Sequence, residues 1–187
     1  MVNDLTQRFS KYPTVGLAYI YCNFRRQDEQ KIDNLLASLL KQLAESCPSL
    51  PRSVKDLYNC HATKRTVPSL GEISSTLHSV AAEYSRVFII VDALDECQTS
   101  GRCRTRLFSE IFNLQKRHQI NILATSRLIR EIVDQFQGSL QLEIRARDED
   151  VRSYLDHHMS PERAFLRKNV QLQEEIKGRI VQVVHGM

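Results

Sequence analysis

The sequence predicts an α/β protein: a three-layer sandwich with a mostly parallel sheet, followed by C-terminal helices. Apolar runs of strand length alternate with amphipathic stretches of helical period along the chain. Strands that are buried on both faces of a parallel sheet read as such near-continuous apolar runs. At 187 residues the chain is also long enough for one domain with a hydrophobic core.

The first half of the chain predicts one strand and three helices. Residues 16–23 (GLAYIYCN) are short, aromatic and β-branched, which is typical of a strand. Three prolines interrupt the segment 47–68, where we expect one short helix around Val54–Tyr58. Ser69 and Glu72 have the spacing of a capping box and begin the next helix. The apolar stripes of the two longer helices are Ile32, Leu35, Leu36, Leu39, Leu40 and Leu43, then Ile73, Leu77, Val80, Ala81 and Tyr84.

The second half predicts three more strands, which makes four. They are Val87–Val91, 120–127 (INILATSR) and 139–144 (SLQLEI). Helices are expected around Leu107–Leu114, over 128–136, over 149–158 with Val151, Tyr154 and Leu155 facing inward, and over Val170–Val184. We assign residues 1–145 to an α/β core and 146–187 to a helical extension of the same domain.

Composition argues against several classes of function. The net charge of +4 is spread along the chain, and no aromatic residues are interleaved with its small basic clusters, so we expect no nucleic-acid binding. No apolar run approaches 18 residues, so we expect no membrane span. Five cysteines without a CxxC pair fit reduced thiols in the cytoplasm.

Three carboxylates follow directly on the most apolar strand, in the stretch VFIIVDALDEC. An Asp fixed at the end of a buried strand can hold the water shell of Mg²⁺, and Asp92 fits that metal-binding role. An acid three or four residues further on can act as a general base on an attacking water, which suggests catalytic roles for Asp95 and Glu96. The alternative is structural: a strand-end Asp begins many turns, and Asp95 could be the N-cap of the following helix.

Polar residues also end the neighbouring strand, at Thr125, Ser126 and Arg127. Ligands of parallel sheets sit beyond the carboxyl ends of the strands, so these residues should share one edge with the acids. A cation and hydroxyls there suit a γ-phosphate, which makes the three residues candidates for nucleotide binding. Arg127 alone could be a surface residue. The pairing of the two patterns favours the functional interpretation.

VFIIVDALDEC followed by INILATSR resembles the NACHT-type P-loop NTPases of the STAND class, in particular fungal proteins with a nephrocystin-like NTPase region. LAYIYCNF, LLASLLKQL and DEDVRSYL support the resemblance, which covers essentially the whole chain. It implies that Asp92 is the Walker B acid, that Asp95 and Glu96 are the extended acidic pair, and that Arg127 is the sensor residue. It also implies Mg²⁺ and ATP or GTP as cofactors.

The sequence departs from that family in one respect, because the phosphate-binding motif G-x-x-x-x-G-K-[S/T] is absent from its 187 residues. In the family, this loop precedes a helix that resembles residues 2–10, so we expect an NTPase core cut at both ends. The family's loop-bearing strand lies between the strand of ATSR and SLQLEI. Without it, either SLQLEI pairs beside the ATSR strand, or a partner fills the gap, or the fold is marginal.

Two functions remain open from the sequence. The first is a piece of a nucleotide-binding signalling switch that is unable to hydrolyse nucleotide alone. The second is a non-enzymatic interaction module or remnant, with another NACHT-type or repeat-containing protein as its partner. The intact acids favour the first function, and the missing loop favours the second.

Overall fold

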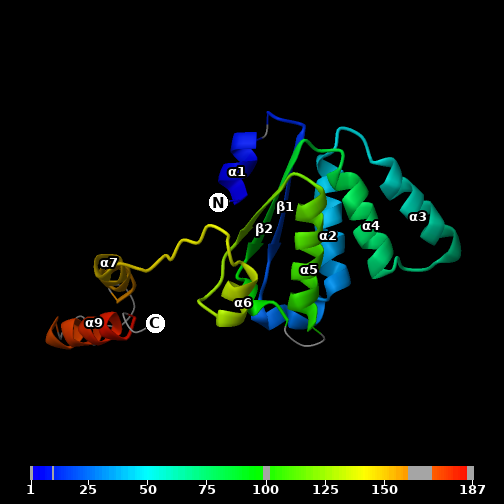
Figure 1. The fold of residues 1–187 in the computed structure, drawn as a ribbon. Helices are drawn as coiled ribbons and strands as arrows, with labels where there is room; N and C mark the ends of the chain where they lie inside the picture. The colour runs from blue at the N-terminus through cyan, green and yellow to red at the C-terminus, as the bar shows by residue number, and fades with distance from the viewer. Residues whose placement is uncertain (1, 10, 99–101, 160–169, 185–187) are drawn as a thin grey trace. The chain divides into compact units, whose positions relative to one another are not determined.

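The computed structural model describes residues 2–9, 11–98, 102–159 and 170–184 of the chain. The chain divides into two compact units, residues 1–137 and 138–187. The first unit contains the sheet and the helices around it, and the second contains a pair of helices (Figure 1). The mixed α/β class and the parallel sheet predicted from the sequence are confirmed.

The sheet of the first unit has three parallel strands in the order β1-β2-β3. They are β1 (Val15–Tyr21), β2 (Arg86–Asp92) and β3 (Ile120–Ala124). Tyr21 lies opposite Asp92, and Val91 lies opposite Ala124, so the strands end at a common edge. β2 is the central strand and the most buried, which agrees with its uninterrupted apolar sequence.

Helices cover both faces of the sheet (Figure 1). The helices α2 (Ile32–Ser46), α4 (Leu70–Ala81) and α5 (Cys103–Arg117) lie together on one face. Their predicted apolar stripes are buried there against alternate residues of the strands. On the opposite face lies α1 (Val2–Phe9), whose Phe9 ring stacks on Phe88 of β2 at 5.0 Å between centroids.

A close approach between the sheet and the helical layer occurs at Gly16 of β1. A Cβ at this position would lie 2.9 Å from Leu43 Cδ2 and 3.2 Å from the Tyr84 ring. The Tyr84 hydroxyl donates to the Leu43 carbonyl at 2.5 Å, so the ring is held in place. Glycine is therefore required here by space rather than by backbone conformation.

The junction of α3 and α4 differs in part from the prediction. The helix α3 runs over Arg52–Lys64 and is longer than the short helix expected around Val54–Tyr58. It starts directly after Pro51, a position that proline tolerates, and the prolines at 48 and 68 lie outside it. The predicted capping box is confirmed: the Ser69 side chain accepts from Glu72 N, and Glu72 Oε2 accepts from Ser69 N at 2.8 Å.

At the outer edge of β1, a side chain satisfies the backbone groups of Tyr19. The Gln42 amide on α2 accepts from Tyr19 N at 2.9 Å and donates to Tyr19 O at 2.9 Å. Its two bonds reproduce the pair that a residue of a neighbouring strand would make. The other edge, on β3, has no strand beside it among the described residues.

The predicted fourth strand at 139–144 is wrong. These residues form no regular structure, and the side chains of Leu140, Leu142 and Ile144 are between 82% and 101% exposed. Their alternation fits a strand, but a strand also needs a partner, and SLQLEI does not pair beside β3. The sequence pattern could not reveal the missing partner.

Three further helices complete the described elements. The first unit also contains α6 (Arg130–Gln135), as predicted over 128–136. The second unit contains α7 (Asp148–Met159) and α9 (Val170–Val184), both where the sequence predicts helices. The Lys177 ammonium joins the two through Asp156 at 2.5 Å. Tyr154, predicted to face inward, is 63% exposed, so that assignment is wrong.

Candidate functional site

The candidate site lies at the carboxyl edge of the sheet, where β2 turns into the short 3₁₀ helix η2 (Leu94–Glu96). Ala93 begins this turn in the left-handed region, at φ 52° and ψ 48°. A non-glycine residue rarely adopts this conformation, so the surrounding contacts must hold it. Leu94 is inserted into the core and anchors the turn, and Asp92, Asp95 and Glu96 around it are partly buried.

Thr125, the first residue after β3, ties that turn to the sheet. Its hydroxyl accepts from Ala93 N at 2.9 Å and donates to Asp92 Oδ1. Its backbone adds two bonds: Thr125 N donates to Val91 O, and Thr125 O accepts from Leu94 N, both at 2.9 Å. The Thr125 hydroxyl therefore orients the Asp92 carboxylate through Oδ1, and Oδ2 accepts no hydrogen bond from the described residues.

The second acid, Asp95, is joined to Arg127 by two bonds. Asp95 Oδ2 accepts from Arg127 Nε at 2.6 Å, and Asp95 Oδ1 accepts from Arg127 N at 3.1 Å. Burial alone would raise the pKa of Asp95, but the hydrogen bonds and the charge of Arg127 outweigh it, so the pKa is lowered. The Asp95 side chain is only 5% exposed, whereas that of Arg127 is 79% exposed. A carboxylate with a lowered pKa and both oxygens in use is a poor general base.

Glu96 and Ser126 point to other partners. Glu96 Oε2 accepts from Phe24 N at 3.2 Å, at the start of the 3₁₀ helix η1 (Phe24–Glu29). This leaves Glu96 without the guanidinium that occupies Asp95. The Ser126 hydroxyl donates to the carbonyl of Arg127 and contacts neither Asp92 nor Asp95. The structure thus brings together Asp92 with Thr125 and Asp95 with Arg127, and it leaves Ser126 apart.

Buried thiols lie beneath the acidic turn. Cys22, Cys97 and Cys103 are each at most 6% exposed. A hydrogen bond with Cys22, followed by burial, raises the pKa of the Cys97 thiol. Burial also raises the pKa of Cys103, to about 11, and its thiol donates to Gln30 O at 3.1 Å. Buried cysteines of this kind act as small apolar groups, and here they support the turn.

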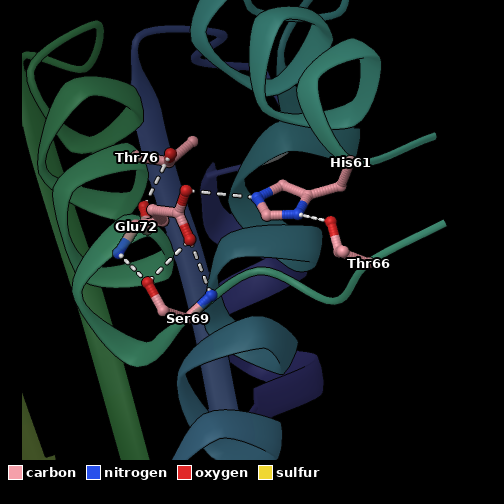
Figure 2. Close-up of polar contacts among 5 residues, drawn as sticks. All are labelled: His61, Thr66, Ser69, Glu72 and Thr76. Carbon is pink, nitrogen blue, oxygen red and sulfur yellow. Dashed lines mark hydrogen bonds and ion pairs between the residues drawn. The ribbon is translucent and has the colours of Figure 1, made fainter. Parts of the chain in front are cut away.

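A second polar cluster lies at the junction of α3 and α4 (Figure 2). His61 contacts Thr66 Oγ1 through Nδ1 at 2.7 Å and Glu72 Oε1 through Nε2 at 3.2 Å. The Ser69 hydroxyl donates to Glu72 Oε2 at 2.6 Å, and bonds from Ser69 lower the Glu72 pKa to about 2. Serine, glutamate and histidine lie close together, but the serine bonds the carboxylate and not the imidazole. His61 therefore cannot act as a general base on the Ser69 hydroxyl, and the cluster does not activate a serine nucleophile.

The donor set at the sheet edge fits one class of metal. Among the described residues, no group of three or more His, Cys, Asp or Glu side chains is arranged to hold a metal ion. A site built only from protein ligands, as for structural zinc, is therefore not formed at Asp92. A single strand-end carboxylate fits Mg²⁺, which keeps several waters and takes its other ligands from phosphate oxygens.

Two features of this site were not found from the sequence. One is the left-handed backbone at Ala93, which the residue type gives no reason to expect. The other is the Phe24 amide, which reaches Glu96 from 72 residues away. The Asn23 side chain that caps η1 by accepting from Arg25 N is a sequence signal for an exposed helix start at this point.

The fold and the edge define an α/β protein with acidic and basic residues at the carboxyl ends of a parallel sheet. A family model described as "Nephrocystin 3, N-terminal" matches residues 1–127. The match spans more than half of the sequence, and the chain belongs to this family. A comparison with curated proteins found no match. In the described part of the chain, every helix is too short or too polar to cross a membrane.

Proposed function

We propose that the sheet edge is the metal and γ-phosphate side of a nucleotide site in a NACHT-type signalling switch. The observation that carries this is the pairing of Asp92 with Thr125, which fixes a carboxylate beyond the end of the central strand. Asp92 would hold Mg²⁺ through its waters, and ATP or GTP would supply the phosphate oxygens. Membership of the nephrocystin 3 N-terminal family is consistent with the resemblance of DALDE and ATSR to NACHT-type sequences.

Each remaining residue has a separate role at this site. Arg127 is exposed and bound to Asp95, so a γ-phosphate would compete with that carboxylate for the guanidinium. Asp95 then serves to position Arg127, and Glu96 is the better candidate for orienting an attacking water. Thr125 orients Asp92, and Ser126 is the more exposed of the two hydroxyl-bearing residues. Residue positions and electrostatics support these roles, and kinetics must test them.

The 187 residues lack the loop whose backbone N–H groups, lysine and hydroxyl grip the β- and γ-phosphates. We therefore expect negligible NTPase turnover from these residues alone. A phosphate-release signal that Glu96→Gln abolishes would contradict that expectation. In a chain that also carries a strand and a G-x-x-x-x-G-K-[S/T] loop, we expect Asp92→Asn to weaken Mg²⁺-nucleotide binding. Unchanged affinity would remove Asp92 from the metal site, and Asp56→Asn on the exposed surface of α3 is the matched control.

A thermal melt with and without Mg²⁺-ADP or Mg²⁺-ATP is the first experiment. A ligand at about 100 times its Kd stabilises a protein by about 2.7 kcal/mol. At this chain length that corresponds to a shift of roughly 5–10 °C in Tm. Such a shift, lost in Asp92→Asn, would show that the sheet edge binds nucleotide without the loop.

The second candidate function is a non-enzymatic interaction module that binds another NACHT-type or repeat-containing protein. The observation in its favour is that Arg127, the cation expected to meet a γ-phosphate, is already bound to both oxygens of Asp95. A cooperative melt that no Mg²⁺-nucleotide shifts would support this function over the first.

A further inference from the structure

Two histidines meet between the helical layer and the entry to β3, away from the carboxyl edge of the sheet. His78 lies on α4, and His118 ends α5 two residues before β3 begins. Nδ1 of His78 and Nε2 of His118 are 3.0 Å apart, and the ring centroids are separated by 5.2 Å. Both rings are half-buried, so they are held in place yet remain accessible from solvent.

We propose that His78 and His118 form a two-histidine site for Zn²⁺ that joins α4 to the start of β3. Zinc binds imidazole nitrogens at about 2.0–2.1 Å, so two nitrogens on one tetrahedral zinc lie about 3.3 Å apart. The observed 3.0 Å is within a few tenths of an ångström of that separation. Small rotations of the two rings would turn both lone pairs toward a shared ion, and water would complete the coordination.

The protons of the histidine pair change position when a zinc ion binds. In the neutral pair, one facing nitrogen carries a proton and donates it to the other. When the ion binds, that proton moves to the outer nitrogen of the same ring, and both facing nitrogens become ligands. No net proton is released above neutral pH. At lower pH a protonated ring must lose its proton first, so binding weakens.

The groups around the pair favour the neutral form of His78 and place one carboxylate nearby. Burial, together with His118 and Arg117, lowers the pKa of His78, and this keeps the ring neutral and ready to bind a metal. Glu110 on α5 acts in the opposite direction and favours positive charge at His78. Its Oε2 accepts from Ser74 Oγ at 2.6 Å, one helical turn before His78 on α4. The site thus offers two nitrogen ligands, and Glu110 adds negative charge without forming a three-ligand group among the described residues.

The test is a titration of the purified, reduced chain with ZnCl₂ at pH 7.5, followed by calorimetry. Changes to groups that merely orient zinc ligands reduce affinity about 10–100-fold, so we expect His78→Gln or His118→Gln to weaken binding at least about tenfold. The matched control is His157→Gln, which alters the other adjacent histidine pair, His157 and His158, with ring centroids 5.6 Å apart. It should leave the affinity unchanged.

Zinc binding that survives either substitution at wild-type affinity would overturn the proposal. A second measurement uses the wild-type chain alone, so its outcome does not depend on whether a variant folds. In the wild-type chain, ¹⁵N spectra of the imidazoles should show both His78 Nδ1 and His118 Nε2 shifting to metal-bound values at one equivalent of zinc. Shifts confined to other histidines, or no shift at either nitrogen, would also overturn it.

Discussion

The replacement of Thr125 by valine should destabilise the turn that carries the acids. Valine keeps the shape of the side chain but removes the hydroxyl. The Ala93 amide then loses its acceptor, and the Asp92 carboxylate loses its donor. Ala93 would retain a left-handed backbone with one fewer contact to hold it there.

The magnitude follows from the two lost bonds. A hydrogen bond to a charged group contributes about 1.5–3 kcal/mol and a neutral one about 0.5–1.5 kcal/mol. Because the site is only half-buried, we expect a loss of about 2–3 kcal/mol in the free energy of unfolding. For a chain of this length that lowers Tm by about 5–10 °C.

The assay is urea denaturation followed by circular dichroism, with Thr125→Ser as the control. Serine retains the hydroxyl and loses only a methyl group, so it should lie much closer to the wild type. Equal midpoints for wild type and Thr125→Val would refute the reasoning, as would a serine variant as unstable as the valine variant. Equal midpoints would mean that the backbone bonds of residue 125 suffice to hold the turn, and an equally unstable serine variant would mean that the methyl group contributes as much as the hydroxyl.

Three further predictions concern the helical layer. Gly16→Val should cost about 1–3 kcal/mol through overpacking against Tyr84; Gly71→Ala, with nothing within 4 Å, is the control, and equal urea midpoints for both would contradict this. Ser69→Ala should cost about 1 kcal/mol by removing the cap of α4, and Ser69→Thr, which keeps the hydroxyl that donates to Glu72, should retain most of it. Burial, followed by the neighbouring His118 and Arg117, lowers the pKa of His78 below its ordinary 6.5. The folded state therefore favours the neutral ring, and the free energy of unfolding should fall as the pH drops below 6.5. Unfolding measured from pH 5 to 8 should show this slope in the wild type and lose it in His78→Gln.

Most of the fold could be predicted because its signals are local. The apolar run from Val87 to Val91 and the stripe of α2 specify a buried strand and an amphipathic helix without reference to the rest of the chain. The capping box at Ser69 likewise depends on residues only three positions apart. Residues 139–144 have an equally good local pattern. Strand formation, however, requires a partner, and that is not a local property.

The candidate site could be predicted only in outline. Two strands that end in polar residues must bring them to one edge, and the sequence is enough to expect that. Which acid meets which base depends on the path of the chain after each strand. Asp95 takes Arg127 because Ala93 turns the backbone into the left-handed region, and Glu96 is thereby directed to Phe24. No property of an alanine in sequence indicates that turn.

The amide of Gln42 has a consequence for how copies of this chain can associate. An endless ladder of identical sheets needs two complementary edges on each copy, and one side chain has removed the edge at Tyr19 from use. In the described part of the first unit, that leaves only the edge of β3 for pairing by backbone hydrogen bonds. Two copies that pair through the same edge are related by a twofold axis and close into a dimer. The Gln42 amide thus works against the addition of a further strand at Tyr19 of β1.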